Sequence, residues 1–154
     1  MHVCLAFLKD KQPLVVKAPR RTGKTTTVIE LAARLAPTHR VCIVASNKSS
    51  ARSCLQAVAG LLRDSEVIGT RVVSTGGWVQ CGTKIDPLAD IVLVDDAQYM
   101  DPAMWSENLD KRFMFIGKPT GNPNKILSSV CRMKDSRGDC LCRAIDIAQR
   151  GAAL

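Results

Sequence analysis

The sequence contains few aromatic residues, which make up only 4% of its 154 positions. This scarcity argues against a nucleic-acid surface built on base stacking, because such surfaces need several exposed rings. Long apolar runs are also missing: stretches such as 91–94 are far shorter than the roughly 20 residues that a membrane span needs. We therefore expect no transmembrane helix.

Acidic residues are outnumbered, with 14 Asp and Glu against 22 Lys and Arg, so the net charge is +8 and the isoelectric point is about 9.4. An excess of this size is typical of proteins with a polyanionic partner, and also of proteins with a solvated basic surface. Sequence alone leaves the two open. The candidate contacts to nucleic acid are Lys48, Arg52, Arg63, Arg71, Lys111, Arg112, Lys125, Arg132 and Lys134.

Paired cysteine motifs are absent as well. The seven cysteines are an odd number with irregular spacing, which does not indicate a disulfide framework. Cys131, Cys140 and Cys142 supply three thiols, but no Cys-x-x-Cys pair accompanies them and both histidines lie far away, so we expect reduced cysteines rather than zinc ligands. The amino terminus has no basic segment before its apolar residues, and we expect an intracellular protein that is not secreted.

Short apolar runs alternate with helical periodicity along the chain. The runs predict strands at 14–16, 41–45, 71–75, 91–94 and 113–116. Helices are predicted from the apolar stripes Val28, Leu31, Ala32, Leu35 and Ala51, Leu55, Val58, Leu62, the second with its N-cap at Ser49 or Ser50, and a last helical region is predicted near 145–148. This alternation predicts an α/β fold with a mostly parallel central sheet flanked by helices.

Parallel sheets bind ligands at the carboxyl ends of their strands. In this chain those ends fall at 18–24, Ser46, Ser74, Asp95 and Gly117, so the sequence predicts a single site where they meet.

The segment Ala18-Pro-Arg-Arg-Thr-Gly-Lys-Thr-Thr26 lies between a predicted strand and a predicted helix. It matches the phosphate loop G-x-x-x-x-G-K-[ST], with Ala18 in place of the first glycine. In that motif the backbone amides cradle phosphates, the lysine reaches the β- and γ-phosphates, and the hydroxyl binds Mg²⁺. The predicted nucleotide-binding residues are Arg20, Arg21, Thr22, Gly23, Lys24, Thr25 and Thr26.

Two carboxylates follow the apolar run 91–94, in the form of a Walker B strand. Asp95 is predicted to hold Mg²⁺ together with Thr25, and Asp96 is predicted to polarise the attacking water. Together the two motifs predict a RecA-like P-loop NTPase domain that binds ATP with Mg²⁺ and spans residues 1–154.

The loop Pro19–Thr25 resembles the Walker A motif of the large terminase subunits of herpesviruses and tailed phages, in which an arginine lies three places before the glycine. Segment 94–100, followed by Pro102 and Trp105, is similar to the terminase Walker B region, and 117–124 looks like the terminase coupling motif. The resemblance covers residues 14 to about 127.

The resemblance implies an ATPase that drives packaging of double-stranded DNA, with subunits assembled in a ring. It implies that Arg20 stabilises the transferring phosphoryl group and that Lys118 and Thr120 sense the γ-phosphate. Asp96 stands where most terminases have Glu, and Lys118 where a hydroxyl residue is usual. A terminase nuclease domain is not expected within this length.

Three other readings fit parts of these motifs. A fragment of a superfamily 1 helicase shares the Asp-Asp-Ala-Gln strand end at 95–98. A thymidine-kinase-like nucleoside kinase shares the same segment but usually carries paired zinc ligands. A nucleotide-binding subunit that does not hydrolyse ATP is the non-enzymatic alternative, because positions 96 and 118 both depart from the terminase pattern.

Overall fold

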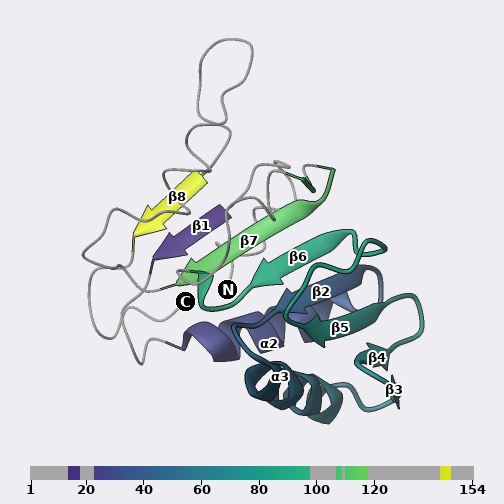
Figure 1. Ribbon diagram of the computed structural model, residues 1–154. Coiled ribbons are helices and arrows are strands. Elements are labelled where there is room, and N and C mark those ends of the chain that lie inside the picture. Colours follow the sequence, from purple (N-terminus) through teal and green to yellow (C-terminus); the bar gives the residue numbers. More distant parts are fainter. Residues whose placement is uncertain (1–13, 18–22, 98–106, 109, 118–142, 147–154) are drawn as a thin grey trace.

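The computed structural model describes residues 14–17, 23–97, 107–108, 110–117 and 143–146 (Figure 1). In chain order the elements are β1 (Leu14–Lys17), α2 (Lys24–Leu35), β2 (Arg40–Val44), α3 (Lys48–Leu61), β3 (Glu66–Ile68), β4 (Arg71–Val73), β5 (Trp78–Gly82), β6 (Ile91–Val94), β7 (Arg112–Gly117) and β8 (Arg143–Asp146). The strands form one 8-stranded sheet in the order β3-β4-β5-β2-β6-β7-β1-β8.

Every pair of neighbouring strands from β5 to β8 is parallel. At the other side of the sheet, β4 pairs antiparallel with both β3 and β5. Strand β7 lies between β1, which leads into the phosphate loop, and β6, which carries the Walker B aspartates. This confirms the predicted α/β class with a mostly parallel sheet. The strand order also matches the branch of P-loop ATPases that inserts a strand between the two motifs.

Helices α2 and α3 lie side by side on one face of the sheet (Figure 1). Their apolar stripes bury against alternate residues of the strands, because successive side chains of a strand point to opposite faces. Val28, Leu31 and Val58 are fully buried. The main core contains these residues and, from the strands, Leu14, Val16, Val41, Ile43, Val72, Val79, Cys81, Ile91, Leu93, Met114 and Ile116.

The opposite face of the sheet holds a second apolar cluster. Its members alternate with those of the first: in β6, Val92 and Val94 belong to it while the intervening residues face the helices. Phe113 and Phe115 of β7 stack there, with ring centroids 5.3 Å apart. A strand buried on both faces is continuously apolar, which explains the four aliphatic residues of β6.

The N-cap of helix α3 lies two or three residues before the predicted one. The N-cap is Asn47, not Ser49 or Ser50, and its side-chain oxygen accepts a hydrogen bond from the Ser50 amide at 2.8 Å. Asparagine satisfies one of the first amides that a helix leaves without an intrahelical acceptor. The first helix, α2, follows the predicted stripe closely, with Val28, Leu31, Ala32 and Leu35 all buried.

Two predictions about strands are wrong. The segment 71–75 was expected to join the parallel sheet, but β4 pairs antiparallel with β5, and the parallel neighbour of β2 is β5 itself. The segment near 145–148 was expected to be helical, but residues 143–146 form β8, which pairs parallel with β1. Tertiary pairing determines both outcomes, since such short segments have little intrinsic preference.

The turn between β4 and β5 depends on two adjacent glycines. A Cβ on Gly77 would fall onto the backbone carbonyl oxygens of Ala36 and His39, and one on Gly76 would fall onto the carbonyl oxygen of Pro37. The close approach lets the Trp78 amide donate to the His39 carbonyl at 3.2 Å, which starts the pairing of β5 with β2. Among the described residues, no helix is long and apolar enough to span a bilayer.

Candidate nucleotide-binding site

The carboxyl ends of β5, β2 and β6 are joined in a row by backbone hydrogen bonds. The Ala45 amide donates to the Gly82 carbonyl at 2.8 Å, and the Asp95 amide donates to the Val44 carbonyl at 2.9 Å. The first turn of α2 lies at these strand ends, so Thr25 of the predicted phosphate-binding segment meets Asp95 after β6. The predicted convergence of strand ends is therefore correct for Ser46, which follows β2, and for Asp95.

Gly23 begins helix α2 in a conformation that other residues rarely adopt. Its φ is 82° and its ψ is 28°, which is the left-handed region. Space is not the constraint, because a Cβ there would meet nothing within 4 Å; the backbone conformation is. The Gly23 carbonyl accepts a hydrogen bond from the Thr27 amide at 2.9 Å. The amides of the first turn precede this bond and have no acceptor within the helix. With no acidic residue in that turn, this helix end could bind a phosphate.

Thr25 and Asp95 connect the two motifs directly. The Thr25 hydroxyl donates to Oδ2 of Asp95 at 2.9 Å across 70 residues of sequence. The second carboxylate oxygen, Oδ1, accepts from the Asp96 amide at 3.0 Å. Asp95 is 5% exposed and Lys24 is 9% exposed, so both charged groups lie in a largely buried setting beside an exposed threonine.

Burial raises the pKa of Asp95 above its ordinary value, and the neighbouring Asp96 carboxylate raises it further. The Thr25 hydroxyl and the Lys24 charge lower that pKa but do not offset the burial. The charged form of Asp95 is thus disfavoured, chiefly because the carboxylate is buried. A hydroxyl and a carboxylate on adjacent elements are the hard oxygen donors that Mg²⁺ prefers, so the residues present fit this ion.

Asp96 also has a left-handed backbone, with a φ of 50°. Asp and Asn are several-fold enriched in this region because their short side chains tolerate it. The conformation gives a backbone reason for aspartate at a position where the terminase pattern has glutamate. Asp95 is buried, whereas Asp96 is partly exposed.

Several predicted site residues lie outside the described residues. These are Arg20, Arg21 and Thr22 of the loop, and Lys118 and Thr120 of the coupling segment. Thr26 is described and is exposed on the first turn of α2. Gly117 ends β7 beside Lys17, the last residue of β1.

Ser74 does not belong to the site. It follows β4, and because β4 runs antiparallel, its amide bonds the Gly77 carbonyl next to the first residue of β5. Ser74 therefore lies at the amino-terminal ends of the parallel strands, whereas Asp95 lies at their carboxyl ends. The sequence missed this because it placed β4, rather than β5, in the parallel set.

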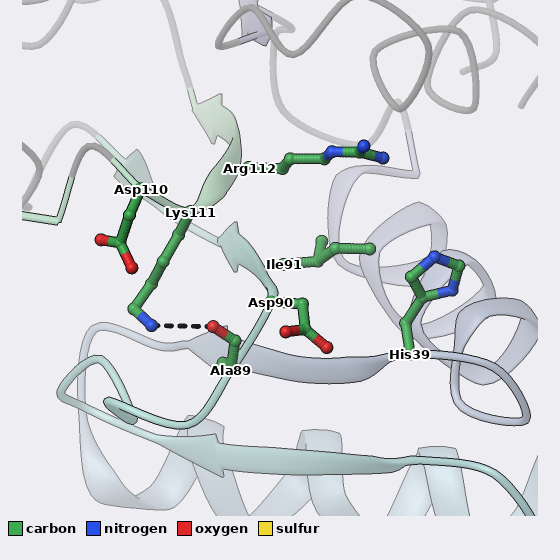
Figure 2. Close-up of a pocket in the computed structure, with 7 residues that line it drawn as sticks. All are labelled: His39, Ala89, Asp90, Ile91, Asp110, Lys111 and Arg112. Carbon is green, nitrogen blue, oxygen red and sulfur yellow. Dashed lines mark hydrogen bonds between the residues drawn. The ribbon is translucent and has the colours of Figure 1, made fainter.

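A cavity of about 400 Å³ lies at the amino-terminal ends of the parallel strands (Figure 2). It is lined by His39, Ala89, Asp90, Ile91, Asp110, Lys111 and Arg112. Two of its charged side chains make contacts within the fold. Lys111 donates to the carbonyls of Pro87 and Ala89 at 2.7 and 2.8 Å, and Asp90 forms an ion pair with Arg40 at 3.0 Å. The Arg40 guanidinium lowers the pKa of Asp90.

Three of the cysteines are described, namely Cys42, Cys54 and Cys81, and all are buried with free thiols. The described residues contain no cluster of three or more His, Cys, Asp or Glu that could hold a metal ion. Cys131, Cys140 and Cys142 lie outside them.

A glycine-started helix at the end of one strand, with a hydroxyl bonded to the carboxylate at the end of another, is the arrangement of a P-loop NTPase. The comparison with known families agrees. A family model for the AAA domain matches residues 8–132, and the chain belongs to this family. A search of curated proteins gives no match.

Proposed function

We propose that this domain binds ATP with Mg²⁺ and hydrolyses it, and that it serves a DNA-packaging motor similar to the terminases. The observation that carries the proposal is the 2.9 Å hydrogen bond between Thr25 and Asp95, which joins the phosphate loop to the Walker B strand. Membership of the AAA domain family supports nucleotide binding. The packaging role rests on the resemblance of the motifs at 19–25, 94–105 and 117–124.

In this proposal the residues divide the work by position. Lys24 and the first amides of α2 bind the phosphates, and Thr25 and Asp95 hold Mg²⁺. Mg²⁺ held by these two residues would neutralise negative charge that develops on the phosphates. Asp96 accepts a proton from the attacking water, and Arg20 stabilises the transferring phosphoryl group.

Membership of the AAA domain family supports a ring-shaped assembly. AAA domains often form rings, and a ring would supply the second body against which a single small domain must move to do work. We propose a homo-oligomeric ring around double-stranded DNA, in which Lys118 and Thr120 relay the state of the γ-phosphate.

Steady-state ATP turnover with and without duplex DNA tests the proposal. We expect turnover that DNA stimulates, that Lys24→Ala abolishes, and that Asp96→Asn lowers by about 10² to 10⁴-fold with little change in ATP affinity. Asparagine is the matched change at position 96, because it keeps the size of the side chain and tolerates the left-handed backbone. Tight ATP binding without turnover would refute hydrolysis and favour a non-hydrolysing nucleotide-binding subunit.

A further inference from the structure

A second cavity, of about 340 Å³, lies between α3 and the edge of the sheet. One wall is the face of α3 that presents Lys48, Ala51, Arg52 and Leu55, residues three or four apart along the helix. The other wall is the β3–β4 turn, with Gly69 and Thr70, and the end of β5 with its following residue, 80–83. We refer to this cavity as the α3 cleft.

The α3 cleft carries two positive charges. Lys48 and Arg52 line it and are both exposed, and none of the described residues that line it is Asp or Glu. Lys48 is the first residue of α3, where a cation opposes the helix dipole. Arg52 follows it by four residues, a spacing at which like charges repel each other. Neither charge is placed to stabilise the helix, and the pair suits an anion.

The remaining lining residues favour a sugar-phosphate backbone. Thr70 and Thr83 bring hydroxyls to the wall opposite the two cations, and Ala51, Leu55 and Cys81 make a mostly apolar floor. The described lining contains no aromatic residue, so it offers no ring on which a base could stack. Two long cationic side chains one helical turn apart can reach successive phosphates of a strand.

The α3 cleft is close to the candidate nucleotide-binding site at the carboxyl ends of the strands. Gly82 at its floor is hydrogen-bonded to Ala45, and Val44 to Asp95, so β5 and β6 are two strand spacings apart, about 10 Å. The buried side of α3 carries Cys54, whose thiol pKa is raised to about 11 by burial and then by the carboxylates of Asp95 and Asp96. One helix therefore contacts the cleft on one side and lies within electrostatic reach of the Walker B aspartates on the other.

We propose that the α3 cleft binds the phosphodiester backbone of DNA through Lys48 and Arg52, and that α3 links this contact to the nucleotide site. The inference rests on the proposed function of a DNA-dependent ATPase and assigns the place where DNA acts. Thr70 and Thr83 donate hydrogen bonds to the same backbone. Contacts of this kind position DNA without reading its sequence.

Fluorescence anisotropy with a labelled duplex of mixed sequence, measured without nucleotide over a range of salt concentrations, tests the proposal. The double variant Lys48→Gln/Arg52→Gln is compared with Arg34→Gln/Arg63→Gln, which removes the same charge from exposed positions away from the cleft. We expect the cleft variant to bind about tenfold more weakly and to lower the salt slope by about 2, while the control changes little.

Turnover separates this inference from the proposed function. The cleft variant should keep its basal, Lys24-dependent ATP turnover and lose stimulation by DNA. Equal DNA affinity and equal salt slope in the cleft and control variants would overturn the inference, even with hydrolysis intact. Loss of hydrolysis in Lys24→Ala with unchanged DNA binding would leave the cleft assignment standing, because the two sites are then separately disabled.

Discussion

Replacing Thr25 with valine tests whether the hydrogen bond to Asp95 joins the phosphate loop to the Walker B strand as strongly as its geometry indicates. Valine has the shape of threonine without the hydroxyl, and both are β-branched with similar helix propensity. The change therefore removes one donor from Oδ2 of Asp95 and leaves the packing nearly unchanged. Any loss of stability reports the contact itself.

The expected size follows from the burial of the two partners. A hydrogen bond to a charged group contributes about 1.5 to 3 kcal/mol. Asp95 is 5% exposed, which favours the upper end, but Thr25 is exposed, so water can reach the vacated position. We expect a loss of about 1.5 kcal/mol, which for a domain of this size lowers the Tm by about 3 to 6 °C.

Urea unfolding at pH 7 measures the free energy of unfolding for the native protein, Thr25→Val, Asp95→Ala and the double variant. The double-mutant cycle isolates the pair, because changes shared with other partners cancel. A coupling energy of about 1 kcal/mol or more is expected. A coupling within about 0.3 kcal/mol of zero would show that the two motifs are not linked by this bond and would remove the main support for the proposed site.

Further predictions concern two glycines, the ionisation of Asp95 and the buried thiols. Gly77→Ala should destabilise by about 3 kcal/mol, because its Cβ would meet backbone carbonyls, whereas Gly60→Ala, in open space on α3, should stabilise by about 0.5 to 1 kcal/mol; equal unfolding midpoints would contradict this. Since burial raises the pKa of Asp95, its ionisation opposes folding, so this group favours stability at low pH and loses that effect as the pH rises through the raised pKa. Mg²⁺-dependent ATP binding should show the reverse, weakening as the pH falls through that same pKa, and a midpoint at or below 3.8 in a calorimetric titration would count against it. Native alkylation at pH 7.5 followed by peptide mass spectrometry should leave the buried thiols unlabelled until denaturant is added; the protected residues are Cys42, Cys54 and Cys81.

The sequence predicts β6 and α2 because their apolar patterns are distinct and the residues that flank them mark their ends. β6 is four aliphatic residues ending in two aspartates, and α2 has an apolar stripe that begins at a glycine. Strands β3 and β5 carry no such pattern. In β5, the residues Trp78 to Gly82 alternate between buried and half-buried, and β3 is exposed throughout, so their existence depends on pairing with strands that local periodicity does not reveal.

The site divides in the same way. The contact of Thr25 with Asp95 follows from two motifs whose spacing and context are specific, and the sequence predicts both partners. The α3 cleft is different, because its far wall comes from a hairpin turn and the end of β5, which were not predicted. Lys48 and Arg52 were candidates among nine scattered cations, and only the tertiary arrangement separates them from the others.

The pairing of β1 has a consequence for how the chain folds during synthesis. β1 leaves the ribosome before the other described strands, yet both of its hydrogen-bonded neighbours, β7 and β8, come from residues 112–117 and 143–146. Until those segments emerge, the strand that supports the phosphate loop has no ladder on either side. Pairings this distant in sequence form slowly and leave apolar strands open to association with other chains. We therefore expect a nascent chain to bind nucleotide only after residues 112–117 and 143–146 have emerged.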